Sequence, residues 1–183
     1  MLLQVSVFIA ISLDGFIARP DGDIGWLEAA GDAAAELPPD EDFGNAAFMA
    51  TVDCIVMGRN TFEKVQSFGE WPYEGKRLVV LSTTLEAPPP GYEERIELHA
   101  GPITDLLESL AADGCKRIYA DGGKTIQSFL REGLIHDLTL TVIPVLLGGG
   151  LPLFGDLAGD IPLRLVSSAG FPNGFVQLVY HVS

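Results

Sequence analysis

Residues 53–62, DCIVMGRNTF, combine a short apolar run with the beginning of a helix. The run that ends at Gly58 is typical of a strand buried on both faces. Arg59 then opens the helix, and Asn60 or Thr61 stands in the capping position. The free backbone N–H groups and the dipole of such a helix favour an anion, and a guanidinium beside them suits a phosphate. An ordinary strand-to-helix turn has the same pattern, so the other turns of the chain must decide between the two interpretations.

The composition of the chain limits the classes of protein to which it can belong. Its 183 residues suffice for one domain, 1–183, with a full hydrophobic core. Hydrophobic residues make up 48% of the chain, which excludes general disorder. The formal net charge of −14 repels nucleic acid and anionic membranes, so we expect neither as a partner. A ligand that carries phosphate would need a local pocket.

The two cysteines, Cys54 and Cys115, lie in apolar segments and are expected to be small buried hydrophobic residues. No metal-ligand spacing surrounds them, so no metal site is expected. The first basic residue is Arg19, beyond the apolar start, so the sequence has no secretory signal pattern. A reducing, cytoplasmic location is therefore expected.

Strands and helices alternate along most of the chain, and strands alone close it. Pro144 indicates a bulge or an edge near the end of one long strand, and the acidic segment at 38–42 indicates a helix start. The order predicts an α/β fold, a three-layer α/β/α sandwich with a mainly parallel mixed sheet and an antiparallel C-terminal edge. Further strands are expected at 3–11, 77–82, 116–120, 136–147, 163–169 and 175–182, and helices at 62–68, 102–112 and from 121–125 to Arg131 or Glu132.

Three of the expected strands end in polar turns, at 58–61, 82–84 and 121–125. Ligands of open α/β sheets bind outside the carboxyl ends of the strands. These turns are rich in Gly, Ser, Thr, Arg and Lys, which favours a phosphate-rich ligand. Two helix starts and a Ser-Thr-Thr turn could hold a pyrophosphate and one further phosphate.

Two glycine motifs do not fit the common nucleotide fingerprints. The sequence GKT at 123–125 would end a P-loop only if a glycine replaced Ile118. The triplet at 148–150 is followed by Pro152 and by no helix, so it lacks the Rossmann dinucleotide pattern. A dinucleotide would have to bind in another way.

Candidate acids and aromatic residues for a substrate site are few. Asp42 stands where a helix begins and could project into a cleft, or it could be a solvated acid at a helix start. Asp14 lies in a turn and could serve only that turn. Asp121, at a strand end, is a better candidate for a substrate-site acid than Asp14. Trp26 could line a pocket for a planar ring, or it could be an aromatic residue of the core.

Five motifs in a fixed order resemble the dihydrofolate reductase superfamily, and especially the RibD C-terminal group, the reductase domain of riboflavin biosynthesis. No single motif is specific, but the ordered set covers nearly the whole chain. The motifs are SLDGFIA at 12–18, VMGRNT at 56–61, VVLS at 79–82, DGGKT at 121–125 and LTVIPVLLGGGLPLF at 140–154.

This resemblance implies an enzyme that uses NADPH. It places Ala10 and Ser12 near the nicotinamide. The other implied cofactor contacts are Gly58, Arg59, Asn60 and Thr61 at the pyrophosphate, Ser82 and Thr83 at the adenosine end with its 2′-phosphate, and Gly122, Gly123, Lys124 and Thr125 at further phosphates.

The substrate is implied less closely than the cofactor. Asp42 lies at about the distance before the VMGRNT motif where folate reductases place their pterin-binding acid, yet the basic pair expected for a ribityl phosphate is not found. We expect hydride transfer to a C=N or C=O bond of a pteridine- or pyrimidine-type substrate, as in 5-amino-6-(5-phosphoribosylamino)uracil reductase. Asp42 would be the catalytic residue, and Asp14, Trp26 and Asp121 would bind substrate. The alternatives are dihydrofolate reduction and a non-catalytic module that binds a nucleotide, pterin or flavin. A homodimer is expected, because related reductases commonly pair.

Overall fold

The centre of the fold is an eight-stranded sheet with the order β5-β4-β3-β6-β1-β7-β10-β9. The computed structural model describes residues 3–32, 37–38 and 40–183. From β5 to β7 every neighbouring pair is parallel, and β10 is antiparallel to both of its neighbours. The predicted mixed sheet with an antiparallel C-terminal edge is confirmed. The strands are β1 Gln4–Ser12, β3 Cys54–Gly58, β4 Arg77–Leu81, β5 Glu97–His99, β6 Arg117–Asp121, β7 Asp137–Ile143, β9 Leu163–Gly170 and β10 Val176–Val182.

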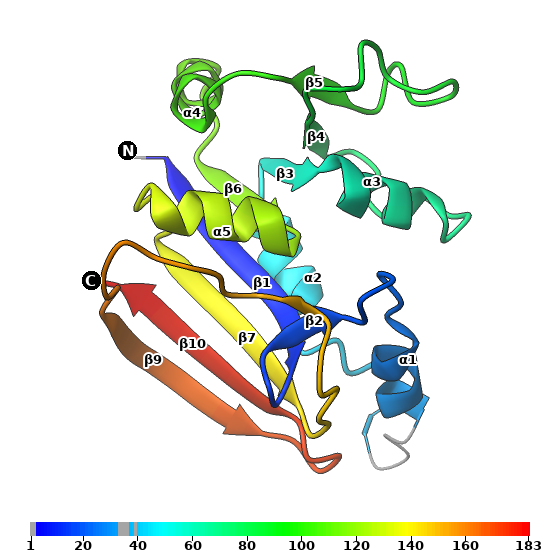
Figure 1. The fold of residues 1–183 in the computed structure, drawn as a ribbon, viewed down its shortest axis with the longest axis vertical. Helices are drawn as coiled ribbons and strands as arrows, with labels where there is room; N and C mark the ends of the chain where they lie inside the picture. The colour runs from blue at the N-terminus through cyan, green and yellow to red at the C-terminus, as the bar shows by residue number, and fades with distance from the viewer. Residues whose placement is uncertain (1–2, 33–36, 39) are drawn as a thin grey trace.

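Helices cover both faces of this sheet and give the predicted three layers. Figure 1 shows α5 lying across β1 and β6 on one face, with α2 behind the sheet on the other. A separate two-stranded sheet is formed by β2 Phe16–Ala18 and β8 Leu151–Pro152. The helices are α1 Gly25–Asp32, α2 Asn45–Thr51, α3 Arg59–Gln66, α4 Ile103–Ala112 and α5 Gly123–Arg131. None of the helices in the described part of the chain has the length and apolar character needed to cross a membrane.

Strand β3 shows why the central strands have no alternating pattern in the sequence. Val56 packs into the core beneath α4 and α5, whereas Ile55 and Met57 pack on the opposite face with Phe62 and Val65 of α3. The three β3 side chains are all 0% exposed. Both faces of the strand need apolar residues, so the sequence is a continuous apolar run.

Four local predictions were wrong or incomplete. The strand β7 ends at Ile143, because Pro144 has no N–H to donate to the ladder, and 144–150 form a loop instead of a bulge. Helix α2 begins at Asn45 and not at 38–42, a segment in which Pro39 lies outside the described residues. Asn60 and Thr61 do not cap α3, because the helix already begins at Arg59 after Gly58. The elements α1, β2, β5 and β8 were not predicted.

Candidate functional site

The turns β3–α3 and β6–α5 interlock at the carboxyl ends of their strands. A Cβ added at Gly58 would lie 3.3 Å from Thr125 Oγ1, on the turn that follows β6. A Cβ added at Gly122 would overlap Thr61 Oγ1, on the turn that follows β3. Each glycine thus leaves the space that a threonine of the other turn fills. Gly122 also has φ +88°, a conformation that favours glycine.

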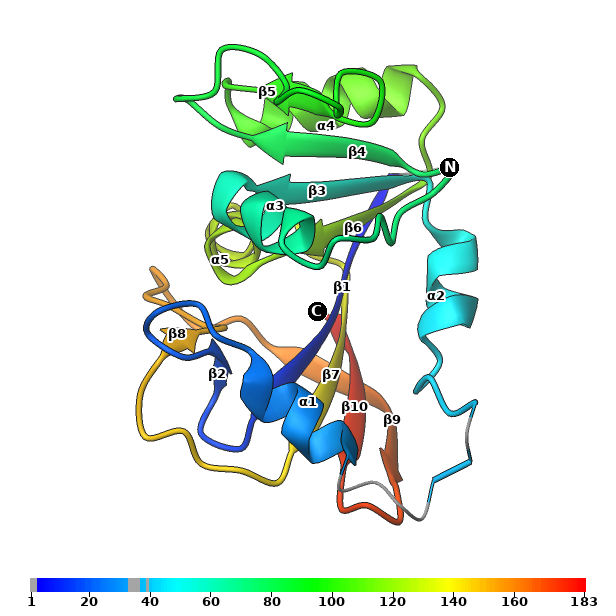
Figure 2. The same cartoon turned by 90° about the vertical axis from the view of Figure 1, so that its right-hand side faces the viewer.

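This interlock brings the starts of α3 and α5 together, as Figure 2 shows at the carboxyl ends of β3 and β6. Neither helix has a hydrogen bond from a capping side chain, and neither has an acidic residue in its first turn. The first-turn N–H groups of both helices are therefore available to a ligand, and both dipoles favour negative charge. Two of the three predicted turns form one candidate anion site.

The third predicted turn, 82–84, is joined to the first by Arg59. Nη1 of Arg59 donates to Thr84 Oγ1 at 2.8 Å, and Nε lies 3.4 Å from Glu63 Oε1. Ser82 is buried, and its Oγ accepts from the backbone N–H of Thr84 at 3.2 Å. Thr83 is exposed beside it. The guanidinium thus lies between the start of α3 and the turn after β4.

Besides Thr83, the exposed members of the predicted cofactor set are Asn60 and Lys124, at the second positions of α3 and α5. Gly123 is closely packed, since an added Cβ would lie 3.0 Å from Ile17 Cδ1 and from the Pro152 carbonyl oxygen. The β2–β8 pair therefore adjoins the start of α5.

Asp14 joins the turn after β1 to the loop after β7. Its carboxylate accepts hydrogen bonds from Ser12 Oγ at 2.6 Å, from Leu147 N at 3.1 Å and from Gly148 N at 2.7 Å. The bond from Ser12, with those from Gly148 and Leu147, holds the pKa of Asp14 below its usual value. These contacts organise the two loops, and substrate binding by Asp14 stays a prediction.

Trp26 lies in a small apolar cluster beside the end of β1. Only 6% exposed, it belongs to a cluster with Ile143 and Phe175, against which Ala10 and Phe43 pack. The buried indole Nε1 has no hydrogen-bond partner among the described residues. An unpaired buried donor is rare, because desolvation without a partner costs free energy. Ala10, which is expected near the nicotinamide, thus packs against the cluster that contains this unpaired donor.

Asp42 is exposed, and its carboxylate serves helix α2. Oδ2 accepts from the Ala46 N–H at 2.8 Å, and Oδ1 accepts from the Gly44 N–H at 2.9 Å. These two bonds lower the pKa of Asp42. A carboxylate held ionised in this way is a poor proton donor near neutral pH. Its catalytic role stays a prediction for which the geometry offers little support.

Asp121 has the opposite environment, at the end of β6. It is half-buried, and Tyr73 Oη lies 3.4 Å from its Oδ2. Burial raises the pKa of Asp121, against the opposing effects of the Gly122 N–H and of the hydroxyls of Tyr119 and Tyr73. Of the predicted acids, Asp121 is therefore the one adapted to hold a proton.

Sequence reasoning missed several aromatic residues on the α2 face of the sheet. Phe48 on α2 stacks on Phe8 of β1 with ring centroids 4.9 Å apart, and it meets Tyr119 edge to face at 5.3 Å. Gln177 Nε2 donates to the Phe43 carbonyl oxygen at 2.9 Å. These residues come from distant parts of the chain, so no local pattern signals their proximity. Phe48 thus places an aromatic ring against β1 and β6 on this face of the sheet.

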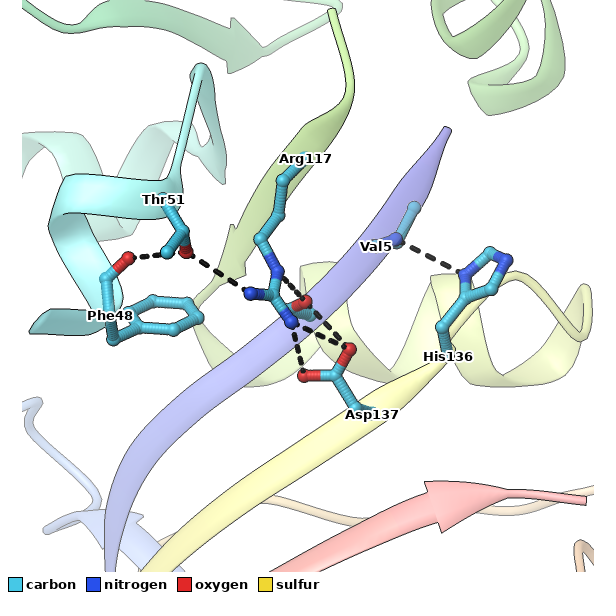
Figure 3. Close-up of polar contacts among 7 residues, drawn as sticks. Val5, Phe48, Thr51, Arg117, His136 and Asp137 are labelled. Atoms are coloured by element: carbon cyan, nitrogen blue, oxygen red, sulfur yellow. Dashed lines mark hydrogen bonds and ion pairs between the residues drawn. The ribbon is translucent and has the colours of Figure 1, made fainter. Parts of the chain in front are cut away.

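At the other end of β6, Arg117 forms an ion pair with Asp137 (Figure 3). Arg117 Nη2 lies 3.3 Å from Asp137 Oδ2, and its Nε donates to Ser6 Oγ at 2.9 Å. Ser6 Oγ in turn donates to Asp137 Oδ2 at 2.9 Å. Nη1 of Arg117 donates to Thr51 Oγ1 at 3.1 Å, which ties α2 to the sheet. Every charge in this cluster has a partner, so its role is structural.

Comparison with known proteins identifies the family. Residues 4–177 match the family model of the RibD C-terminal domain. The uncharacterized protein YwjB of Bacillus subtilis (strain 168) is 34% identical over 180 residues, which are 95% of each chain.

Solved structures give the same result. A protein from Shewanella sp. PV-4, provisionally named a riboflavin biosynthesis protein, is 41% identical, with a TM-score of 0.91 over 99% of both chains. The diaminohydroxyphosphoribosylaminopyrimidine deaminase/5-amino-6-(5-phosphoribosylamino)uracil reductase of Thermotoga maritima has a TM-score of 0.71 at 16% identity, and the likeness covers 99% of this chain and 57% of that one. At that identity the second likeness concerns the fold alone. The chain belongs to the RibD C-terminal domain family, a family of reductase domains.

Proposed function

We propose that this protein is an NADPH-dependent reductase that transfers hydride to a C=N or C=O bond of a small heterocycle of pteridine or pyrimidine type. The observation that carries the proposal is the interlock of Gly58 with Thr125 and of Gly122 with Thr61, which brings two uncapped helix starts together. A dinucleotide pyrophosphate matches such a site in charge. The RibD-type relatives support the same reading.

The residues around the interlock fit the parts of NADPH. Arg59, with its planar donors at the 82–84 turn, would hold the 2′-phosphate or the pyrophosphate. Asn60, Lys124 and the first-turn N–H groups would hold the remaining phosphate oxygens. Ala10 and Ser12 would border the nicotinamide. When bound, the cofactor supplies the hydride, and the chain supplies its position and the polarity around it.

The substrate would lie on the α2 face of the sheet. Trp26, with its unpaired Nε1, would donate a hydrogen bond to it, and Phe48 would contact its ring. The named activity that this reaction resembles most is 5-amino-6-(5-phosphoribosylamino)uracil reduction. Dihydrofolate reduction is the alternative, and Asp42→Asn distinguishes the two, because a folate-type enzyme should lose most of its activity at neutral pH.

Calorimetric titration with NADPH and NADH tests the cofactor directly. We expect NADPH to bind more tightly, and Arg59→Gln to weaken NADPH binding about tenfold, equivalent to ~1.4 kcal/mol. Arg131→Gln, in the last turn of α5, is the matched control and should bind as the wild type does. Absence of binding by either nucleotide at millimolar concentration would contradict the proposal.

Turnover separates an enzyme from a binding module of the same fold. NADPH-loaded protein is incubated with a panel of pteridines, pyrimidines and ribosylamino-uracils while the NADPH absorbance is followed. Loss of absorbance that depends on one compound supports the reductase. Tight binding with constant absorbance supports the module and contradicts turnover.

We also propose a homodimer formed through the β9–β10 hairpin, in the cytoplasm, where the free cysteines Cys54 and Cys115 remain reduced. Every residue of β9 is exposed, and Leu163, Leu165 and Val176 are each at least 40% exposed. Such apolar exposure on an edge strand favours association. Light scattering should give a dimer mass, and Leu165→Lys should reduce it to a monomer mass. A monomer mass for the wild type would refute this part.

A further inference from the structure

Polar side chains form a row across four strands at the amino ends of β1 and β7. The sheet register places Ser6 of β1 opposite Asp137 of β7. Asp137 lies opposite His181 of β10, which in turn lies opposite Arg164 of β9. Side chains at paired positions of neighbouring strands point to the same face of a sheet. The row therefore lies on one face, at the end of the sheet opposite to the interlocked turns.

The charges in the two halves of this row differ. In the inner half, Asp137 is paired with Arg117 and accepts a hydrogen bond from Ser6 Oγ, as Figure 3 shows. The outer half carries Arg164, which takes part in none of the ion pairs between described residues. A guanidinium keeps its charge at every physiological pH. The unmatched charge of the row is therefore positive.

A pocket of about 500 Å³ opens at this row. It is lined by Asp137, His181 and Arg164, together with Gln4 at the start of β1 and His136 just before β7. Its volume lies in the range of sites that bind small molecules. Its two charged side chains are Asp137, whose charge is balanced within the protein, and Arg164. In a chain with a net charge of −14, the pocket thus offers a local positive charge to a ligand.

Neutral hydrogen-bond donors accompany Arg164 in the lining of the pocket. His136 Nδ1 accepts the Val5 N–H at 3.1 Å, so the proton of its ring is on Nε2 (Figure 3). Gln4 adds a side-chain amide, and His181 adds a second imidazole. These groups come from different strands. A phosphate has oxygens in several directions and can accept from several strands at once, whereas a carboxylate has two oxygens in one plane.

We propose that this pocket is an anion site for a small phosphate monoester, with Arg164 as its charged contact and His136 and His181 as hydrogen-bond donors. A pocket of this volume suits a small organic molecule better than an inorganic ion. Leu163 and Leu165, the residues of the proposed dimer contact, alternate with Arg164 along β9 and so point to the opposite face. Binding at this pocket is independent of the proposed reductase activity.

The three histidines of the chain report on binding in an NMR titration. His136 and His181 line the pocket, whereas His99 ends β5 at the far edge of the sheet and is an internal control. The imidazole C–H signals are assigned by single substitutions. They are then followed at constant pH and ionic strength while glycerol 3-phosphate or inorganic phosphate is added. We expect the signals of His136 and His181 to shift and saturate at millimolar concentration, with tighter binding of the monoester, and the signal of His99 to stay in place.

Substitutions of arginine locate the binding. Arg164→Gln should weaken it about tenfold, because the variant loses the charged donor. Arg164→Lys keeps the positive charge and should lose less. Arg19→Gln, at an exposed turn, is the matched control and should bind as the wild type does. Arg59→Gln, at the candidate cofactor site, should likewise leave the titrations of His136 and His181 unchanged.

Three outcomes would overturn this site. The signals of His136 and His181 could stay in place, or they could move equally with chloride at the same ionic strength. Arg164→Gln could also bind as tightly as the wild type. Equal affinities for inorganic phosphate and glycerol 3-phosphate would overturn the assignment to a monoester.

Discussion

The two ends of strand β6 carry ionisable side chains on the same face of the sheet, but only the one at the amino end has an oppositely charged partner. At the amino end, the Arg117 guanidinium meets Asp137, Ser6 and Thr51, so its charge is matched inside the protein (Figure 3). At the carboxyl end, Asp121 is half-buried with tyrosine hydroxyls and one backbone N–H around it. In the Arg117 cluster the polar groups bind one another. The surroundings of Asp121 contain no opposite charge, so its carboxyl can change its protonation state.

This difference gives a rule for interpreting the polar residues of this fold. A buried charge with a full set of partners fixes the structure, whereas one without an opposite charge is available for chemistry. Asp42 contrasts with Asp121, because it is exposed and its carboxylate accepts hydrogen bonds from two backbone N–H groups.

Arg117→Met should have the largest effect on stability. It leaves Asp137, which is 7% exposed, without its cation, and the free energy of unfolding should fall by about 3 kcal/mol. Urea denaturation measures the loss. Arg164→Met, at an exposed position of β9, is the control and should change stability by less than about 0.5 kcal/mol. Equal effects of the two substitutions would contradict the structural role of the Arg117–Asp137 pair at the amino end of β6.

Gly122→Ala should have the second largest effect on stability. The added Cβ overlaps Thr61 Oγ1 at a residue with φ +88°, so we expect a loss of about 2 kcal/mol and much weaker NADPH binding. Gly58→Ala has φ −79° and a contact of 3.3 Å, and it should cost less than about 1 kcal/mol. Denaturation and calorimetric titration of both variants measure the contrast. A Gly122→Ala protein as stable as the wild type would contradict the interlock.

Asp121→Asn should change stability in a pH-dependent way. Because burial raises the pKa of Asp121, its contribution to stability is complete below the ordinary value of 3.8 and declines as the pH rises through the folded-state pKa. The amide escapes this decline, so the Tm advantage of the variant over the wild type should be larger at pH 7 than at pH 3.

Asp42→Asn is the opposite case. Its lowered pKa gives stability that is present above 3.8 and lost as the pH falls, so this variant should have a lower Tm at pH 7 and lose its difference in acid. Parallel pH profiles for the two variants, measured by thermal unfolding, would remove the distinction between the acids.

Thr51→Val should have the smallest effect. It removes the Arg117 Nη1 bond to an exposed hydroxyl and should cost about 0.5–1 kcal/mol by urea denaturation. The exposed Thr83→Val is the control. A loss as large as that of Arg117→Met would mean that the ion pair depends on its link to α2.

The sequence predicted the parallel half of the fold well, because local patterns determine it. Apolar runs, glycine turns and helix spacing located β3, β4, β6, α4 and α5 with errors of one or two residues. It also predicted correctly the antiparallel C-terminal edge, which the last two strands form. Helix α1 and the short strands β2, β5 and β8 were missed, because two or three residues, or a segment without clear periodicity, carry too little local signal.

The residues of the candidate site also fall into those that local sequence patterns predicted and those that they did not. The 58–61 and 122–125 turns were found because glycines and helix starts are visible in the sequence, although their direct interlock was not. Tyr73, Phe48 and Gln177 were not found, because each acts through a neighbour that is 40 or more residues away along the chain. Burial decides between Asp42 and Asp121, and burial is a property of the folded chain.

The interlocked turns also have an evolutionary consequence. Position 122 and the side chain at 61 compete for one volume, as do position 58 and the side chain at 125. A relative with a larger residue at 122 must therefore carry a smaller one at 61, and substitutions at these sites should be inherited in pairs. Natural variation at the start of α3 is then constrained by the start of α5, although more than 60 residues separate them in sequence.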